Sequence, residues 1–161
     1  MARVLIVGCG CRGLALARGL SPEHAVRATS RSPERIAELE KAGIEGVVAD
    51  PDRLATIAPF LSGVSVVCWL MGTALGSPDL HGARLRTLTE HLVDTPVRGM
   101  VYEAGGTVDP SLLEQGAQIV RDASETWHIG GEVVGADPAD HEAWLGAMRE
   151  AVGRTLSTSS A

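Results

Sequence analysis

Residues 8–13 read Gly8-Cys9-Gly10-Cys11-Arg12-Gly13, directly after the apolar run 4–7 and before the helical run 14–20. Each glycine of this G-x-G-x-x-G turn meets a separate steric demand. The first allows a tight turn off a strand, the second lets a pyrophosphate approach the backbone, and the third lets the helix pack closely. The stretch predicts a dinucleotide-binding unit with the phosphates at the helix N-terminus. A plain strand–turn–helix corner without a ligand is the alternative.

The length and composition of the chain favour one globular domain. The 161 residues are 45% hydrophobic and carry a formal net charge of −6. This length is sufficient for one hydrophobic core. We expect a single domain over residues 1–156 and a disordered tail over 157–161, where nothing is available to bury. The arginines are scattered and form no basic block, which argues against a nucleic-acid partner.

Cysteine usage and the N-terminal sequence bear on location. The three cysteines, Cys9, Cys11 and Cys68, are an odd number, and Cys9 and Cys11 have no second ligand pair at zinc-site spacing. We therefore expect no metal site and a cytoplasmic protein. The first apolar run is too short for a signal peptide or a membrane span, so no membrane association is expected.

Apolar runs alternate with helical segments along the whole chain. Several helices are expected to begin at a capping residue followed by proline, as in Ser32-Pro33, Asp50-Pro51, Asp109-Pro110 and Asp137-Pro138. Expected strands lie near 3–7, 24–30, 45–49, 64–70, 97–103 and 130–136. Expected helices lie near 11–20, 33–43, 51–61, 79–94, 110–126 and 138–155. Continuous apolar strands that alternate with helices predict an α/β, doubly wound (Rossmann) parallel sheet of about six strands.

The end of the second expected strand indicates which nucleotide would bind. NAD sites usually place an acidic residue there to hold the ribose 2′-hydroxyl, whereas this chain has Ser30-Arg31-Ser32. The Arg31 guanidinium can pair with a 2′-phosphate, with the serine hydroxyls beside it and Arg12 closing the pocket from the other side. This predicts NADP(H) rather than NAD(H). The alternatives are solvated surface charges for the two arginines and a helix cap for Ser32.

Four motifs stand in the first half of the chain: Val-Gly-Cys-Gly-Cys-Arg-Gly at 7–13, Ala-Thr-Ser-Arg-Ser-Pro-Glu at 28–34, Val-Val-Ala-Asp-Pro-Asp at 47–52 and Leu-Ser-Gly-Val-Ser-Val-Val at 61–67. Together they resemble the N-terminal half of atypical and extended short-chain dehydrogenase/reductase proteins, the NmrA-like NADP-binding proteins among them. The resemblance implies that Asp50 binds the adenine amino group, although Asp50 is equally explained as a helix cap. It also implies that the cofactor passes over Leu70, Met71 and Gly72.

The chain departs from this family in its catalytic residues. Short-chain dehydrogenases commonly use a Tyr-x-x-x-Lys pair, but here Tyr102 is followed four residues later by Gly106. The single lysine, Lys41, lies in the second expected helix. The family's catalytic serine is also missing, and we expect no C-terminal lobe to enclose a substrate.

Three residues remain as candidates for catalysis. Glu103, at the end of the fifth expected strand, is the first candidate for an acid or base. Tyr102 could donate a proton, and His81 follows a flexible segment that could fold over a nicotinamide. The alternatives are a solvated loop carboxylate for Glu103, a packed ring for Tyr102 and a surface position for His81.

Two classes of function follow. The first is a reductase that positions NADP(H) and a small-molecule substrate with little acid–base help. The second is a non-enzymatic NADP(H)-binding redox sensor or regulatory subunit with a protein partner. A third, the nucleotide-binding domain of an ion-channel regulator, is weakened because such domains usually carry an acid at the position of Ser30. We also expect a homodimer, with contacts through helices 79–94 and 110–126, because Leu85, Leu88 and Leu92 form one helix stripe. The alternative is that this stripe faces the sheet of its own chain.

Overall fold

The computed structural model describes residues 2–74 and 76–158 and contains one six-stranded sheet with helices on both faces. All strands are parallel and their order is β3-β2-β1-β4-β5-β6. The strands are β1 (Arg3–Val7), β2 (Ala25–Ser30), β3 (Glu45–Val48), β4 (Val66–Trp69), β5 (Gly99–Glu103) and β6 (Gly130–Val134). The strand order reverses between β1 and β4, and this reversal is the place where doubly wound sheets bind ligands. The predicted fold class is confirmed.

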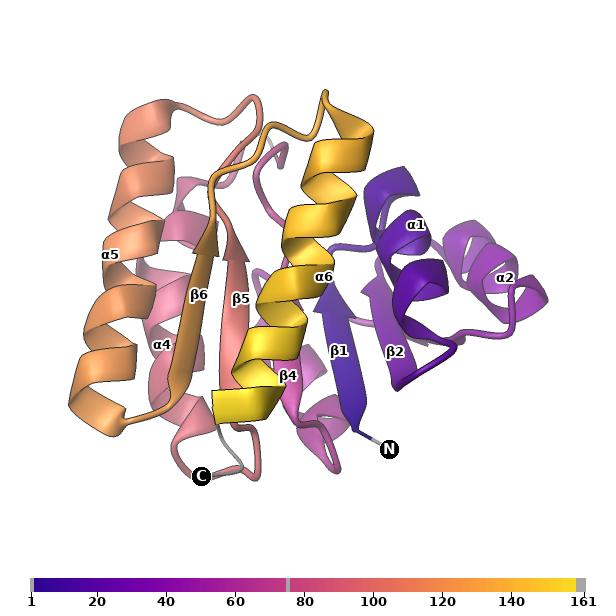
Figure 1. Cartoon of the computed structure of the whole chain (residues 1–161), viewed down its shortest axis with the longest axis horizontal. Helices are drawn as coiled ribbons and strands as arrows, with labels where there is room; N and C mark the ends of the chain where they lie inside the picture. The colour runs from indigo at the N-terminus through magenta and orange to yellow at the C-terminus, as the bar shows by residue number, and fades with distance from the viewer. Residues whose placement is uncertain (1, 75, 159–161) are drawn as a thin grey trace.

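The longer helices form two layers around this sheet. They are α1 (Cys11–Leu20), α2 (Pro33–Lys41), α4 (Ala83–Leu92), α5 (Pro110–Trp127) and α6 (His141–Thr158). Helices α1, α2 and α6 cover one face, and α4 and α5 cover the other (Figure 1). Each face has its own apolar core: Leu16, Trp144 and Met148 belong to the first, and Leu85 and Ile57 to the second.

The pairs of a capping residue and a proline predicted some helix starts correctly and others incorrectly. Ser32 caps α2 by accepting from the Arg35 amide at 3.4 Å, and Asp109 caps α5 by accepting from the Ser111 amide at 2.8 Å. Asp137 instead closes a local turn onto the Ala139 amide at 2.9 Å, so α6 begins at His141 rather than at 138.

The expected helix 51–61 is absent as such. It is replaced by the four-residue helix α3 (Leu54–Ile57) and the 3-10 helix η1 (Ala58–Leu61). The Asp50 carboxylate accepts from the Asp52 amide at 2.9 Å and caps a turn, so the interpretation of Asp50 as a helix cap is wrong. Pro59 then supplies no amide hydrogen, which prevents a continuous helix.

The helix expected over 79–94 is divided at Gly82 into a 3-10 helix, η2 (Pro78–His81), and α4. Its leucine stripe faces the sheet: Leu85, Leu88 and Leu92 are all fully buried within this chain. The stripe therefore gives no support for a dimer contact. At the C-terminus, α6 continues to Thr158, so residues 157 and 158 of the expected tail are helical, and 159–161 lie outside the described residues.

Candidate functional site

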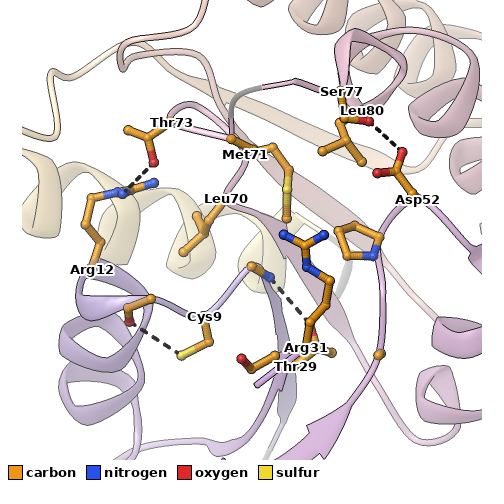
Figure 2. Close-up of a pocket in the computed structure, with 16 residues that line it drawn as sticks. Cys9, Arg12, Thr29, Arg31, Asp52, Leu70, Met71, Thr73, Ser77 and Leu80 are labelled. Carbon is orange, nitrogen blue, oxygen red and sulfur yellow. Dashed lines mark hydrogen bonds between the residues drawn. The ribbon is translucent and has the colours of Figure 1, made fainter. Parts of the chain in front are cut away.

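A cleft of about 410 Å³ lies at the carboxyl ends of β1, β2 and β4, where the strand order reverses. Figure 2 shows its walls, which come from the glycine turn, the ends of β2 and β3, and the segment that follows β4. Its lining residues are Gly8, Cys9, Gly10, Arg12, Thr29, Ser30, Arg31, Ala49, Pro51, Asp52, Leu70, Met71, Thr73, Ala74, Ser77 and Leu80.

The glycines of the turn have distinct surroundings. Gly8 has φ +91°, and a Cβ there would lie 2.4 Å from Met71 Cε and 2.6 Å from the Leu70 carbonyl oxygen. A Cβ on Gly13 would lie 2.9 Å from Cys9 Sγ. A Cβ on Gly10 would meet nothing within 4 Å. Gly8 and Gly13 are thus required by close packing of the protein itself, whereas Gly10 leaves open space in the cleft.

The first turn of α1 supplies hydrogen-bond donors beside this space. Helix α1 begins at Cys11, and the Gly10 carbonyl accepts its first helical bond, from the Leu14 amide at 2.9 Å. The amides of Cys11, Arg12 and Gly13 therefore precede the helical hydrogen-bond ladder and have no partner within it. Such a helix start favours an anionic group.

The end of β2 carries a cation and hydroxyl groups. Arg31 is exposed and its guanidinium extends across the cleft toward Met71 (Figure 2). Ser30 lines the same wall and accepts from the Ser32 amide at 3.1 Å through its hydroxyl. Ser32 itself points to α2, where its hydroxyl donates to Glu34 at 2.9 Å. The end of β2 therefore presents positive charge in place of an acidic residue.

Of the twelve residues predicted to bind a cofactor, seven line the cleft. These are Gly8, Gly10, Arg12, Ser30, Arg31, Leu70 and Met71. The remaining five, Cys11, Gly13, Ser32, Asp50 and Gly72, are absent from its lining, and the Gly72 amide is bonded to Glu103 Oε1 at 2.8 Å.

Sequence reasoning missed Asp52 and Ser77, which line the cleft beyond the ends of β3 and β4. The Ser77 hydroxyl donates to Asp52 Oδ1 at 2.6 Å and joins two loops that are 25 residues apart in sequence. The motif at 47–52 contains both Asp50 and Asp52, so it did include a residue of the cleft. The sequence of this motif did not show which of the two carboxylates faces the cleft.

Glu103 lies behind the cleft wall and is fully buried. Its Oε2 accepts from Arg12 Nε at 3.0 Å and from Trp144 Nε1 at 2.9 Å, while Oε1 accepts from Arg12 Nη2 and the Gly72 amide, both at 2.8 Å. The carboxylate on β5 is thus joined to α1, to the segment that follows β4 and to α6 through four hydrogen bonds. This environment differs from that of a solvated loop carboxylate.

Tyr102 and His81 form a second buried group. His81 Nδ1 lies 2.6 Å from the Tyr102 hydroxyl, and His81 Nε2 lies 3.1 Å from the Met71 carbonyl oxygen. The carbonyl can only accept, so the ring is protonated at Nε2 and the tyrosine donates to Nδ1. Burial lowers the pKa of His81 and raises that of Tyr102. Both side chains are neutral near neutral pH, and neither lines the cleft.

Of the cysteines, Cys9 lines the cleft, and both Cys9 and Cys68 are buried. Burial raises the pKa of Cys9 to about 11, and that of Cys68 to about 12. Within residues 2–74 and 76–158, no group of three histidine, cysteine, aspartate or glutamate side chains is arranged to hold a metal ion. None of the helices in this part of the chain combines the length and apolar character that a membrane crossing needs.

No protein-family model matches the chain, and no curated protein matches it either. Solved structures do. The NADP(H) complex of triphenylmethane reductase from Citrobacter sp. is 18% identical, with a TM-score of 0.63, and the match covers 80% of this chain and 47% of the reductase. Vestitone reductase from alfalfa is 14% identical, with a TM-score of 0.62, and the match covers 84% of this chain and 56% of that enzyme. The chain spans about half the length of these reductases.

A smaller structure matches over nearly its whole length. The NAD(P)-binding domain of an exopolyphosphatase-related protein from Archaeoglobus fulgidus is 20% identical, with a TM-score of 0.60, covering 93% of this chain and 99% of the domain. At these identities the likeness concerns the fold. The chain has the doubly wound fold of NAD(P)-binding Rossmann proteins, as its resemblance to short-chain dehydrogenase/reductase proteins implied.

Proposed function

We propose that this protein binds NADP(H) in the cleft at the glycine turn. The observation that carries the proposal is the placement of Arg31, an exposed cation that lines the cleft at the end of β2. A guanidinium there can pair with a 2′-phosphate, whereas NAD sites use a carboxylate at this position. The NADP(H) complex of the similar triphenylmethane reductase supports the same assignment.

Each part of the nucleotide would contact a different part of the cleft. The pyrophosphate would lie over Gly10, where the first amides of α1 point and a side chain is absent. The adenosine would lie between Arg31 and the loop that carries Asp52, and the nicotinamide half would lie beyond β4, against Met71. When bound, NADPH supplies the hydride for reduction, and the residues named here bind and orient it.

Non-enzymatic binding, as a redox sensor or regulatory subunit, is the second candidate function. It is favoured by the environment of the three residues predicted to be catalytic. Glu103, Tyr102 and His81 are at most 1% exposed, and each is hydrogen-bonded inside the protein. A reductase acting on a small molecule would have to release Glu103 from four donors before the carboxylate could exchange a proton with the substrate.

Nucleotide preference tests the proposal directly. We expect the protein to bind NADPH more tightly than NADH in fluorescence titrations. Arg31→Ala should weaken NADPH binding by about 10- to 100-fold and leave NADH binding unchanged, because a charge-assisted pair contributes about 1.5–3 kcal/mol. Arg121→Ala, which removes an exposed arginine of α5, is the matched control and should change neither affinity. Equal affinities of the parent for both nucleotides would contradict the proposal.

We further propose a cytoplasmic homodimer. The cytoplasmic setting is inferred from cysteine usage. The dimer would form over the groove between α4 and α5, which Ile119 and the 45% exposed Trp127 line together with Arg86 and Glu90. Two copies related by a two-fold axis could place Arg86 of one against Glu90 of the other, with the apolar side chains between them.

A further inference from the structure

Glu103 and Arg12 form the most heavily buried ion pair among the described residues. Glu103 has a fully buried side chain, and that of Arg12 is 23% exposed. Two parallel hydrogen bonds, of 3.0 and 2.8 Å, hold the Arg12 guanidinium against the carboxylate. The Arg12 guanidinium carbon also lies 5.8 Å from the centre of the Trp144 ring. One edge of the guanidinium is therefore fixed by groups behind the wall of the cleft.

The other edge of Arg12 reaches the cleft. Arg12 Nη1 donates to the Thr73 hydroxyl at 3.1 Å, and both residues line the cleft. Of the described residues that line it, Arg12 and Arg31 are the two that carry positive charge. Figure 2 shows them apart, Arg12 on α1 with its guanidinium directed to Thr73 and Arg31 at the end of β2. A single 2′-phosphate would not use both.

We propose that Arg12 binds the nicotinamide-side phosphate of the dinucleotide and that Glu103 is the positioning residue that fixes Arg12 for this contact. The inference rests on the proposed binding of NADP(H). A dinucleotide with its 2′-phosphate at Arg31 and its pyrophosphate over Gly10 would extend to Thr73, in the segment that follows β4. The edge of the Arg12 guanidinium that does not contact Glu103 lies at this place. The phosphate would replace the Thr73 hydroxyl as the partner of Nη1.

The physical reason for Glu103 is preorganisation. A free arginine side chain loses rotamer entropy when it is immobilised on a ligand. The two hydrogen bonds to Glu103 already restrict the Arg12 side chain, so the phosphate contact is made without this loss. The buried carboxylate also balances the Arg12 charge.

Binding of two ligands of different length distinguishes the proposed phosphate contact of Arg12 from a general destabilisation of the protein. NADPH carries both phosphates of the pyrophosphate, whereas adenosine 2′,5′-bisphosphate carries the 2′-phosphate and the adenine-side phosphate alone. Arg12→Lys keeps the charge opposite Glu103 but lacks the second donor edge. Glu103→Gln removes the carboxylate, and Glu103→Asp, which keeps the charge on a shorter side chain, serves if the glutamine variant does not fold. Circular dichroism and thermal unfolding establish that each variant is folded.

We expect Arg12→Lys and the Glu103 variant to weaken NADPH binding by about 10- to 100-fold, and to change binding of adenosine 2′,5′-bisphosphate by less than about twofold. Arg31→Ala, as the comparison, should weaken both ligands. Equal loss of both ligands in the Arg12 and Glu103 variants, or no loss of either, would overturn the inference while the proposed function stands. If the parent binds neither ligand, the proposed function fails and this inference with it.

Discussion

At the scale of single residues, two glycines of one turn separate folding from ligand binding. Gly8 has positive φ, and the segment that follows β4 occupies the space that a side chain would need, so the absence of a side chain at Gly8 serves the fold. Gly10 has no protein atom within 4 Å of an added Cβ, so its smallness serves whatever enters the cleft. The same sequence motif therefore contains two different physical requirements.

Valine at Gly10 should leave the protein folded and remove its nucleotide affinity. We expect Gly10→Val to keep the thermal unfolding midpoint of the parent within a few degrees, while NADPH binding weakens at least tenfold because the side chain occupies the pyrophosphate path. Gly8→Ala is the contrasting variant. It should lose at least about 2 kcal/mol of stability from the positive φ and from overlap with Met71 and Leu70. Parent-like NADPH binding by Gly10→Val would show that the turn is no phosphate site.

The His81–Tyr102 pair should make stability depend on pH. Burial holds the pKa of His81 below its ordinary value of 6.5, so between the two pKa values the unfolded state binds the additional proton. The stability contributed by neutral His81 is therefore present above about pH 6.5 and is lost as pH falls. The full loss is about 1.4 kcal/mol for each pH unit that separates the pKa of His81 in the folded protein from its pKa in the unfolded chain. Chemical denaturation at pH 5 and pH 7 should show a larger loss for the parent than for His81→Gln. An equal loss in both proteins would contradict this.

At the scale of secondary-structure elements, continuous apolar runs made the strands predictable. All six strands lie within about two residues of their expected bounds because parallel strands buried on both faces leave a continuous pattern. Two helix starts were displaced because Asp50 and Asp137 close local turns, a use of aspartate that sequence does not distinguish from capping. The helix expected over residues 51–61 does not continue through Pro59, a proline within the expected range.

Helix α5 contains a glycine whose replacement should reverse the usual effect. Alanine in place of a helical glycine normally stabilises by up to about 1 kcal/mol. At Gly116, however, a Cβ would lie 2.1 Å from the Tyr102 hydroxyl oxygen and 2.4 Å from its ring carbon Cζ. Gly116→Ala should therefore destabilise the protein, by about 1–3 kcal/mol as overpacking usually does. Gly146→Ala in α6 is the matched control, because a Cβ there meets nothing within 4 Å, and it should stabilise.

At the scale of the whole molecule, the location of the cleft was more predictable than its chemistry. A glycine turn after the first strand and a strand reversal beside it place a ligand at the same sheet edge in any doubly wound protein. Long-range pairing was not visible in the sequence. Arg12 and Glu103 are 91 residues apart, and His81 and Tyr102 are 21 apart, yet each pair is bonded. The residues predicted to be catalytic from their places at a strand end or in a loop are thus buried. They are hydrogen-bonded to each other or to a residue that lines the cleft.

The outer face of α4 and α5 carries the prediction about assembly. The leucine stripe of α4 is buried against the sheet, so association must use side chains that this fold leaves outside. Trp127 is the largest of these, at the end of a groove that also contains Arg86 and Glu90. We expect light scattering at micromolar concentration to give the mass of a dimer for the parent and of a monomer for Trp127→Asp, since a carboxylate would have to be desolvated in the contact. Val48→Asp on β3 is the control, because Val48 is 59% exposed and lies at the opposite edge of the sheet, so it should leave the dimer intact. A parent protein of monomeric mass would end the dimer proposal and leave the proposed nucleotide cleft unaffected, because the residues that line this cleft lie outside the groove between α4 and α5.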